Sequence, residues 1–318
     1  MMLSGAGNSG FKHHKQGDKM QFYRSAACAT LFYCVASQAV LAQSFPQPDL
    51  GKLTATGGVT QIEGAGGGGL TPWALITGYG SRDSYGANAH VATVGTNDYA
   101  LQTGGIAVGI ADRVELSLAT QTFSGHKAPL DQLRLRMDIL GVKVKLAGDA
   151  VYDQDRALPQ IAIGAMAKRT HGIGSLGALG VASVTQLGAA SDHGIDYYAS
   201  ATKIYLDQSV LVNGTLRLTK ANQMGLLGFG GDRRDSYRPM LEGSVAYLFN
   251  RKTVAGVEYR MKPHNLSVDD EKAYYDAFVA WFPTKHLSIT AAYVSLGDIT
   301  IFNPKRQNGY YLSLQAGF

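Results

Sequence analysis

The chain has 318 residues, of which 17% are charged, with 39 glycines and 17 tyrosines. Its net charge of +5 comes mostly from the first 42 residues, because the rest holds 25 Lys and Arg against 23 Asp and Glu. No basic run is interleaved with aromatic residues, so the sequence lacks the pattern of a nucleic-acid binder, and we expect no nucleic acid among its partners. Abundant Gly and Tyr with little charge favour a single β architecture.

Residues 1–42 are interpreted as a secretory signal peptide. A largely apolar run at 25–39 follows Arg24, and residues 40–42 supply a small residue before the expected cleavage site. The polar stretch before Met20 is long for a signal peptide, which leaves both Met1 and Met20 open as the natural start.

Both cysteines of the chain, Cys28 and Cys34, lie inside the expected signal peptide. The mature chain therefore has no thiol, and we expect neither a disulfide nor a cysteine metal ligand.

A Gly-rich N-terminal segment, 43–72, comes next. It contains a formal Gly-x-Gly-x-x-Gly at 64–69, but Pro72 prevents the helix that a dinucleotide site requires. We instead expect the glycines to let backbone pack closely across the mouth or lumen of a barrel. The segment is predicted to be either a lumen plug or a first strand.

Residues 58–76 read Gly-Val-Thr-Gln-Ile-Glu-Gly-Ala-Gly-Gly-Gly-Gly-Leu-Thr-Pro-Trp-Ala-Leu-Ile. This run resembles the opening of a family of proteobacterial outer-membrane proteins catalogued as a domain of unknown function. The likeness continues through 104–117 and, more loosely, to the C-terminus. The resemblance implies an outer-membrane β-barrel and brings no activity with it.

Segments of alternating apolar and polar residues recur over 73–318, which is the expected barrel domain. The connections between them alternate between short and long, as periplasmic turns and external loops do, and only 148–158 breaks the rule. The expected strands are 73–80, one within 86–110, 113–123, 135–147, 158–168, 196–206, 210–220, 239–249, 252–262, 273–282, 286–296 and 309–318.

These segments predict an all-β fold: a transmembrane, antiparallel, up-and-down β-barrel of 12 strands. If 86–94 and 100–110 are separate strands, then 53–62 would supply another and give the alternative of 14, since such barrels have an even number of strands. Within 133–146 the apolar residues change from odd to even positions, which predicts a β-bulge near Ile139 and Leu140.

The last strand ends on an aromatic residue and resembles the terminal strand that the barrel-assembly machinery recognises in bacterial outer membranes. The expected assembly signal consists of Tyr310, Leu312, Leu314 and Phe318. The expected partners are therefore outer-membrane lipid and this machinery, and the expected location is the outer membrane of a Gram-negative bacterium.

Charged residues that alternate with apolar ones are expected to face the lumen, because charge is costly against lipid. The predicted pore-lining residues are Arg113, Glu115, Lys143, Lys145, Lys203, Arg217, Glu242, Glu258, Arg260 and Asp276. They either line a passage for small polar solutes or pair across a narrow lumen and fill it.

The predicted function is a narrow channel or porin for small polar solutes, with a structural or adhesive barrel as the alternative. An outer-membrane hydrolase is less favoured, because neither a Gly-x-Ser-x-Gly elbow nor a His-Glu-x-x-His motif is present. Ser191, Asp192 and His193 would be the first candidates if a residue of another loop joined them. We therefore expect no enzyme, no catalytic residue, no metal and no cofactor.

Overall fold

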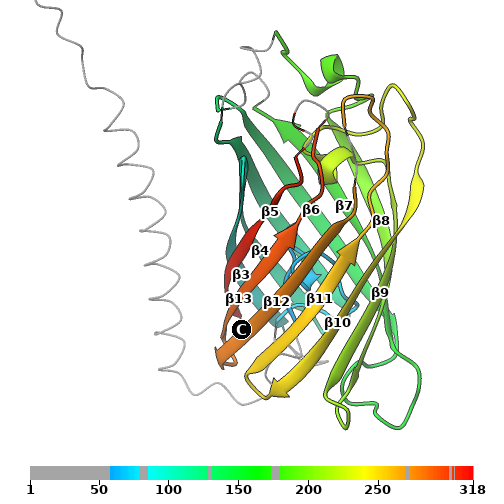
Figure 1. Cartoon of the computed structure of the whole chain (residues 1–318). Coiled ribbons are helices and arrows are strands. Elements are labelled where there is room, and N and C mark those ends of the chain that lie inside the picture. The colour runs from blue at the N-terminus through cyan, green and yellow to red at the C-terminus, as the bar shows by residue number, and fades with distance from the viewer. Residues whose placement is uncertain are drawn as a thin grey trace, which may run out of the picture. The chain divides into compact units, whose positions relative to one another are not determined.

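In the computed structural model of the chain, twelve antiparallel strands form one closed barrel (Figure 1). Each strand pairs with its neighbours in sequence, and the last pairs with the first, so the predicted 12-stranded up-and-down barrel is confirmed. The structure describes residues 58–78, 85–127, 131–172, 180–269, 272–300, 303 and 305–317. The expected signal peptide and Phe318 lie outside these residues.

The barrel strands carry the labels of Figure 1. They are β3 (Tyr85–Thr96), β4 (Tyr99–Ile110), β5 (Val114–Gly125), β6 (Arg134–Ala147), β7 (Gln160–His171), β8 (His193–Tyr205), β9 (Val210–Thr219), β10 (Arg238–Asn250), β11 (Thr253–Arg260), β12 (Tyr274–Thr284), β13 (Leu287–Ser295) and β14 (Asn308–Gly317). Two short 3₁₀ turns, η2 (Val184–Leu187) and η3 (Asn222–Gly225), lie in the loops. No helix among the described residues has the length and hydrophobicity to cross a membrane.

The predicted number of strands was right, but two of the predicted strands, 73–80 and the one within 86–110, were wrong. The described part of 73–80 forms no barrel strand, and 86–110 contains two strands, β3 and β4. Only Asn97 and Asp98 separate those two strands, so a tight hairpin lies inside the segment that was predicted to hold one strand. The two errors cancel, and the 14-stranded alternative is also wrong.

The predicted bulge near Ile139 is absent. β5 and β6 pair without a register shift from Val114 and Val144 to Ser124 and Arg134. Leu135, Met137 and Ile139 are instead buried on the same face as Lys143. The sequence pattern changes phase because the lumen itself changes from polar to apolar along the strand, not because the backbone does.

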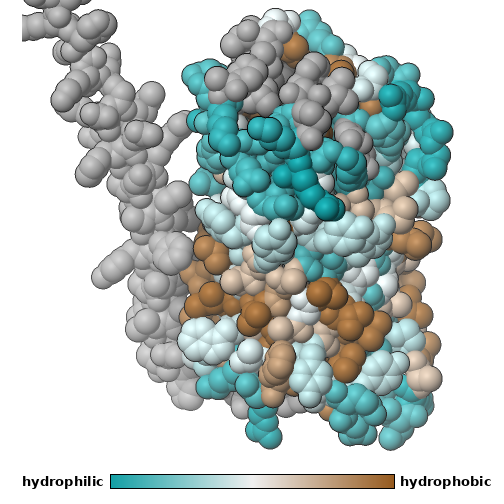
Figure 2. Space-filling model, in the orientation of Figure 1, coloured by the Kyte–Doolittle hydropathy of each residue, from teal (hydrophilic) through white to brown (hydrophobic). Residues whose placement is uncertain are grey.

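The outer surface of the barrel carries a belt of apolar side chains. Exposed large residues include Leu116 and Leu118 on β5, Leu140 on β6 and Val257 on β11. Figure 2 shows apolar residues gathered around the middle and lower part of one face, with hydrophilic residues at both ends. Water would disfavour an exposed apolar area of this extent, so the belt is suited to lipid.

We expect an arginine in the middle of this belt to cost far more than one at its edge. Leu140→Arg should lower the free energy of unfolding in lipid vesicles by about 2–4 kcal/mol, and Leu146→Arg, near the end of the same strand, by about 0–1 kcal/mol. Both side chains are about half exposed, at 57% and 50%. Urea titrations measure the difference, and equal costs would contradict a lipid-facing belt.

Candidate functional site

The lumen is occupied by residues 58–78, which we call the plug; all of these residues are buried. Two short strands, β1 (Val59–Thr60) and β2 (Gly66–Gly67), pair with each other inside the barrel, where Figure 1 shows this segment in blue. The plug's backbone is bonded to the wall on several sides: Ala74 N–H donates to Thr202 (2.8 Å), and the Ile62 carbonyl accepts from Gln121 (2.8 Å).

The glycine run allows this close approach. A Cβ on Gly67 would overlap the Thr71 carbonyl, and a Cβ on Gly68 would overlap the Glu258 carboxylate. Gly64 also has a φ of +100°, a conformation that side chains other than glycine rarely adopt. The run that looked like a nucleotide motif is therefore a packing surface.

Glu63 is the charged centre of the plug. Its carboxylate accepts a hydrogen bond from Arg260 (2.7 Å), forms an ion pair with Lys168, and lies 3.5 Å from the guanidinium of Arg217. Burial alone would raise the pKa of Glu63, but Arg260, Lys168 and Arg217 hold it well below its usual value. Glu63 is thus a carboxylate that needs cations from three strands of the wall.

The same three cations also bind anions of the wall. Arg217 donates to Glu242 (2.5 Å) and lies 3.3 Å from Asp196, while Lys168 lies 2.6 Å from Asp196. Three cations and three carboxylates therefore balance in a network that excludes water almost completely. Buried charges are tolerated only when they are paired in this way.

A second buried ion pair holds the other end of the plug. The ammonium of Lys143 lies 3.0 Å from Glu115 and donates to the carbonyls of Gly66 (2.7 Å) and Leu75 (2.8 Å). Glu115 accepts from the backbone N–H of Gly66 (2.9 Å) and of Thr77 (2.8 Å). Each wall charge thus serves a backbone group that would otherwise be buried without a partner.

A third polar cluster lies at Glu258 on β11. Its carboxylate accepts from the Leu70 N–H, the Thr71 hydroxyl and the Ser244 hydroxyl, each at 2.7 Å. Asp276 lies opposite Glu258 in the register of β11 and β12. One of its carboxyl oxygens, Oδ1, is buried and has no hydrogen-bond partner.

Most of the predicted pore-lining residues do have buried side chains on the lumen side. These are Glu115, Lys143, Arg217, Glu242, Glu258, Arg260 and Asp276. They contact the plug or one another and line no open passage in this structure, which agrees with the alternative that the charges pair across a narrow lumen.

Three of the predicted residues lie elsewhere. Arg113 is exposed in the turn between β4 and β5, where it donates to the carbonyl of Lys145 (3.3 Å). Lys145 pairs with Asp112 (2.8 Å) and Asp149 (3.5 Å) at the rim. Arg113 precedes β5, so strand alternation does not determine its direction, whereas Lys145 still pairs with Ala162 of β7 and has the same parity as Lys143.

Lys203 does not face the lumen either. Along β8 the lumen side carries even-numbered residues such as Tyr198 and Ser200, and Lys203 shares the outer face with Tyr197. Its ammonium donates to the carbonyl of Asp153 in the connection after β6, which buries the side chain. The unusually long connection at 148–158 therefore explains how a charge is kept off the lipid.

Three members of the network were not predicted: Glu63, Lys168 and Asp196. Glu63 stood inside the Gly-rich motif, and Asp196 began its expected strand. Lys168 is followed by Arg169, so charge alone could not say which of the two faced inward. The alternation of Met166, Lys168 and Thr170, all buried, was the available signal.

A second segment enters the barrel from the side opposite the short turns. Residues 221–226 of the loop between β9 and β10 are buried, and Gln223 and Met224 have φ values of +46° and +63°. The Met224 carbonyl accepts from Lys168 (3.1 Å) and the Gly225 carbonyl from Thr170 (2.6 Å). Lys168 thus joins residues 221–226, which we call the inward loop, to the plug.

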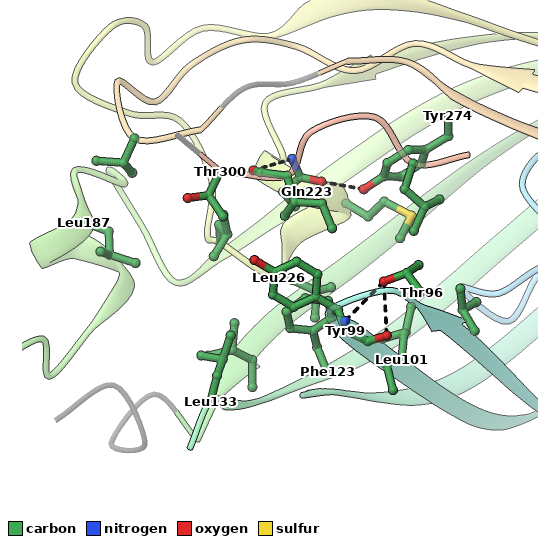
Figure 3. Close-up of a pocket in the computed structure, with 18 residues that line it drawn as sticks. Thr96, Tyr99, Leu101, Phe123, Leu133, Leu187, Gln223, Leu226, Tyr274 and Thr300 are labelled. Carbon is green, nitrogen blue, oxygen red and sulfur yellow. Dashed lines mark hydrogen bonds between the residues drawn. The ribbon is translucent and has the colours of Figure 1, made fainter. Parts of the chain in front are cut away.

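Above the inward loop lies an apolar cavity of about 120 Å³. Figure 3 shows its lining, with Leu101, Phe123 and Leu133 on one side and Gln223 and Tyr274 on the other. Gln223 is held by the Tyr274 hydroxyl (2.5 Å) and by its own donation to Asp269 (2.7 Å). Few polar atoms are left to face a molecule in the cavity.

At the rim, Asp98 fastens the β3–β4 hairpin to the last long loop. Its carboxylate accepts from Asn303 (2.9 Å), Lys127 (2.7 Å) and Gln307 (2.8 Å), and these hydrogen bonds hold the pKa of Asp98 well below its usual value. The hairpin therefore stays anchored at any ordinary pH.

The described residues form neither the triad considered for Ser191, Asp192 and His193 nor a metal site. Ser191 (3.1 Å) and Asp192 (2.7 Å) both contact the same ring nitrogen, Nδ1, of His193, whereas a triad requires one partner on each nitrogen. All three lie at the surface. No group of His, Asp or Glu within the described ranges is placed to hold a metal ion.

The expected assembly residues lie on the outer face of β14. Tyr310 and Leu312 are about half exposed, and Leu314 is partly buried on the same face. Their recognition by an assembly machinery stays a prediction.

A family model described as "Protein of unknown function (DUF3034)" matches residues 56–315. None of the curated proteins compared with the chain matches it. Among solved structures, the chain is loosely similar to the KdgM porin (11% identity, 73% of this chain and 99% of that one, TM-score 0.44) and to the NanC porin (9%, 72% and 98%, 0.47). It is also loosely similar to the COG4313 outer membrane channel from Pseudomonas putida F1 (9%, 78% and 97%, 0.44).

Loss of the Glu63 charge should release the plug. Glu63→Gln leaves the three buried cations of the network with only two buried carboxylates, Asp196 and Glu242, at a cost of about 3–5 kcal/mol. In a Trp281→Phe background, Trp73 is the single tryptophan of the chain and lies in the lumen, so its emission should shift to the red as water enters.

The control is Asp138→Asn, which removes an exposed ion pair with Arg136 and should cost about 0–1 kcal/mol. Identical Trp73 emission in both variants would show that Glu63 does not hold the plug.

Adjacent glycines of the plug should differ in their tolerance of a methyl group. Gly68→Ala forces a Cβ into the Glu258 carboxylate and should cost about 1–3 kcal/mol by overpacking. Gly69→Ala meets its nearest neighbour at 3.4 Å and should cost much less. Urea unfolding of the two variants measures the difference, and a reversed order would contradict the position of the plug.

Proposed function

Because the chain belongs to the DUF3034 family, as its Gly-rich motif predicted, and that description gives no activity, we propose a function from the interior of the barrel. The protein is an outer-membrane channel for small molecules, closed by its own N-terminal plug. Its place is the outer membrane of a Gram-negative bacterium, since the apolar belt suits lipid and the fold is a closed barrel.

The observation that carries this proposal is the way the plug is held. Wall side chains hold it by hydrogen bonds and ion pairs, such as those of Arg260 and Lys143, and water can replace such bonds when a segment moves. A barrel that served only as a scaffold could fill its lumen with apolar side chains of the strands. A polar plug that is held by replaceable bonds and lies below an apolar cavity supports a passage that the plug opens and closes.

The competing functions are less well supported. A hydrolase triad also needs an orienting group on the second ring nitrogen of its base, and at His193 both Ser191 and Asp192 contact Nδ1. We do not propose small polar solutes, because the cavity above the plug is apolar. A structural or adhesive barrel differs from a channel in conducting no ions, and the following experiment separates the two.

A disulfide between plug and wall should close the channel. The hydroxyl oxygens of Thr71 and Ser244 lie 2.6 Å apart, so Thr71→Cys with Ser244→Cys places two sulfurs within bonding reach. The mature chain has no other cysteine to compete. We expect the oxidised double variant to be silent in planar bilayers and to conduct after reduction with dithiothreitol.

Each single cysteine variant serves as a control and should conduct before and after reduction. Equal conductance of the oxidised and reduced double variant would mean that the plug does not close the passage. Absence of conductance in wild type and in every variant would favour the structural barrel.

A further inference from the structure

We propose that the apolar cavity and the smaller cavity beneath it form a binding site for an apolar small molecule that carries one hydroxyl group. The inference rests on the channel function proposed above and names the class of solute that would enter it. The upper cavity receives the apolar body, and the lower cavity receives the hydroxyl group.

The upper cavity fits an apolar body. Its walls come from β4, β5 and β6 on one side and from the inward loop on the other, with Leu101, Phe123, Leu135 and Leu226 among the lining residues. A sugar or an ion placed there would lose its hydration without gaining enough hydrogen bonds. An aromatic or aliphatic ring would gain by removing apolar surface from water.

The lower cavity adjoins the upper one. Both are lined by Val94, Leu101, Met224, Tyr274 and Leu296. Beyond these shared residues the lower cavity reaches Gly69 of the plug and the side chains of Asp276 and Tyr311. The lower cavity therefore lies between the upper one and the plug, beside Asp276 of β12 and Tyr311 of β14.

Asp276 supplies a recognition atom at this end. Its side chain is buried (7% exposed), lies opposite Glu258 in the register, and has an oxygen, Oδ1, without a hydrogen-bond partner. A carboxyl oxygen can accept a hydrogen bond, so Oδ1 is an unused acceptor. A buried acceptor without a partner favours a ligand that brings a donor.

A hydroxyl group fits better than a carboxylate. It can donate to Oδ1 of Asp276, and Asp276 and Tyr311 both line this cavity. A ligand carboxylate would bring a further negative charge beside Glu258 and Asp276, in a site where burial strengthens repulsion. The absent side chain of Gly69 leaves the space in front of these groups open, with Asp276 Oδ2 at 3.5 Å from where a Cβ would stand.

The lower cavity also lies on the side of the plug that makes the fewest hydrogen bonds to the wall. Within the described part of the chain, the plug's hydrogen bonds go to side chains of strands β3 to β11 and β14. One partner from each of these strands, in chain order, is Asn88, Thr103, Gln121, Lys143, Gln160, Ser200, Thr215, Ser244, Glu258 and Gln315. The lower cavity lies where Asp276 of β12 and Val294 of β13 face the plug.

Photolabelling tests the site without requiring ion flow. Purified wild-type protein in detergent is irradiated with an aryl diazirine that carries a phenolic hydroxyl, and the modified residues are mapped by mass spectrometry. We expect saturable labelling at lumen residues such as Leu101 and Tyr274, and non-saturable labelling at Leu118 in the belt. Excess 2-naphthol should abolish the lumen labelling, naphthalene should reduce it less, and 2-naphthoate should leave it unchanged.

Variants make the result specific. Leu101→Trp fills the shared wall of the two cavities and should remove lumen labelling, whereas Leu116→Trp on the outer face of β5 should not. Asp276→Leu should remove the preference for 2-naphthol over naphthalene, and Asp276→Asn, which keeps an acceptor oxygen, should retain it. Heat-modifiable migration in gels shows that each variant is folded.

Three outcomes would overturn the proposal: lumen labelling that is absent or does not saturate, equal competition by 2-naphthoate, or no effect of Leu101→Trp. Labelling that is saturable in detergent but lost in phospholipid vesicles would identify a lipid acyl chain as the occupant, and would also overturn it. Because the assay measures occupancy, a failure here is distinct from a failure of the conductance experiment.

Discussion

Everything inside the barrel depends on the need to neutralise a few buried charges. Lys168, Arg217 and Arg260 would each be costly in a closed lumen, and the wall carboxylates Asp196 and Glu242 supply only part of the counter-charge. Glu63 supplies the remainder and does so from a different part of the chain. The position of the plug is thus fixed by electrostatics, and the glycines around Glu63 allow the backbone to come close enough.

The periodicity of the sequence was sufficient for the barrel and for much of its lumen. Glu115 and Lys143 were placed correctly because each lies well inside a strand, where alternation is strict. Alternation does not extend into the turns, which is why Arg113 was misplaced, whereas Lys145 has the parity of Lys143 and forms its ion pairs at the rim. Lys203 was misplaced for another reason: a connection distant in sequence covers it, and no local pattern reports that contact.

The apolar cavity could not be predicted from the sequence for a similar reason. Leu135 and Met137 looked lipid-facing because a barrel lumen was assumed to be polar over its whole length. In the structure they are buried, at 1% and 0% exposure, and help to form a hydrophobic upper lumen. A single sequence gives the face of a residue relative to its neighbours in the strand, but it does not say what fills the space that the face borders.

The connection between the plug and the last strand has a consequence for how the protein forms. Thr60 bonds through its backbone N–H (2.6 Å) and its hydroxyl (2.9 Å) to Gln315 on β14, the strand that closes the barrel against β3. The two residues are 255 positions apart, so this contact closes almost the longest loop within the described residues. It can form only when β14 and the plug are both in place, which links closure of the final strand pair to the position of the plug.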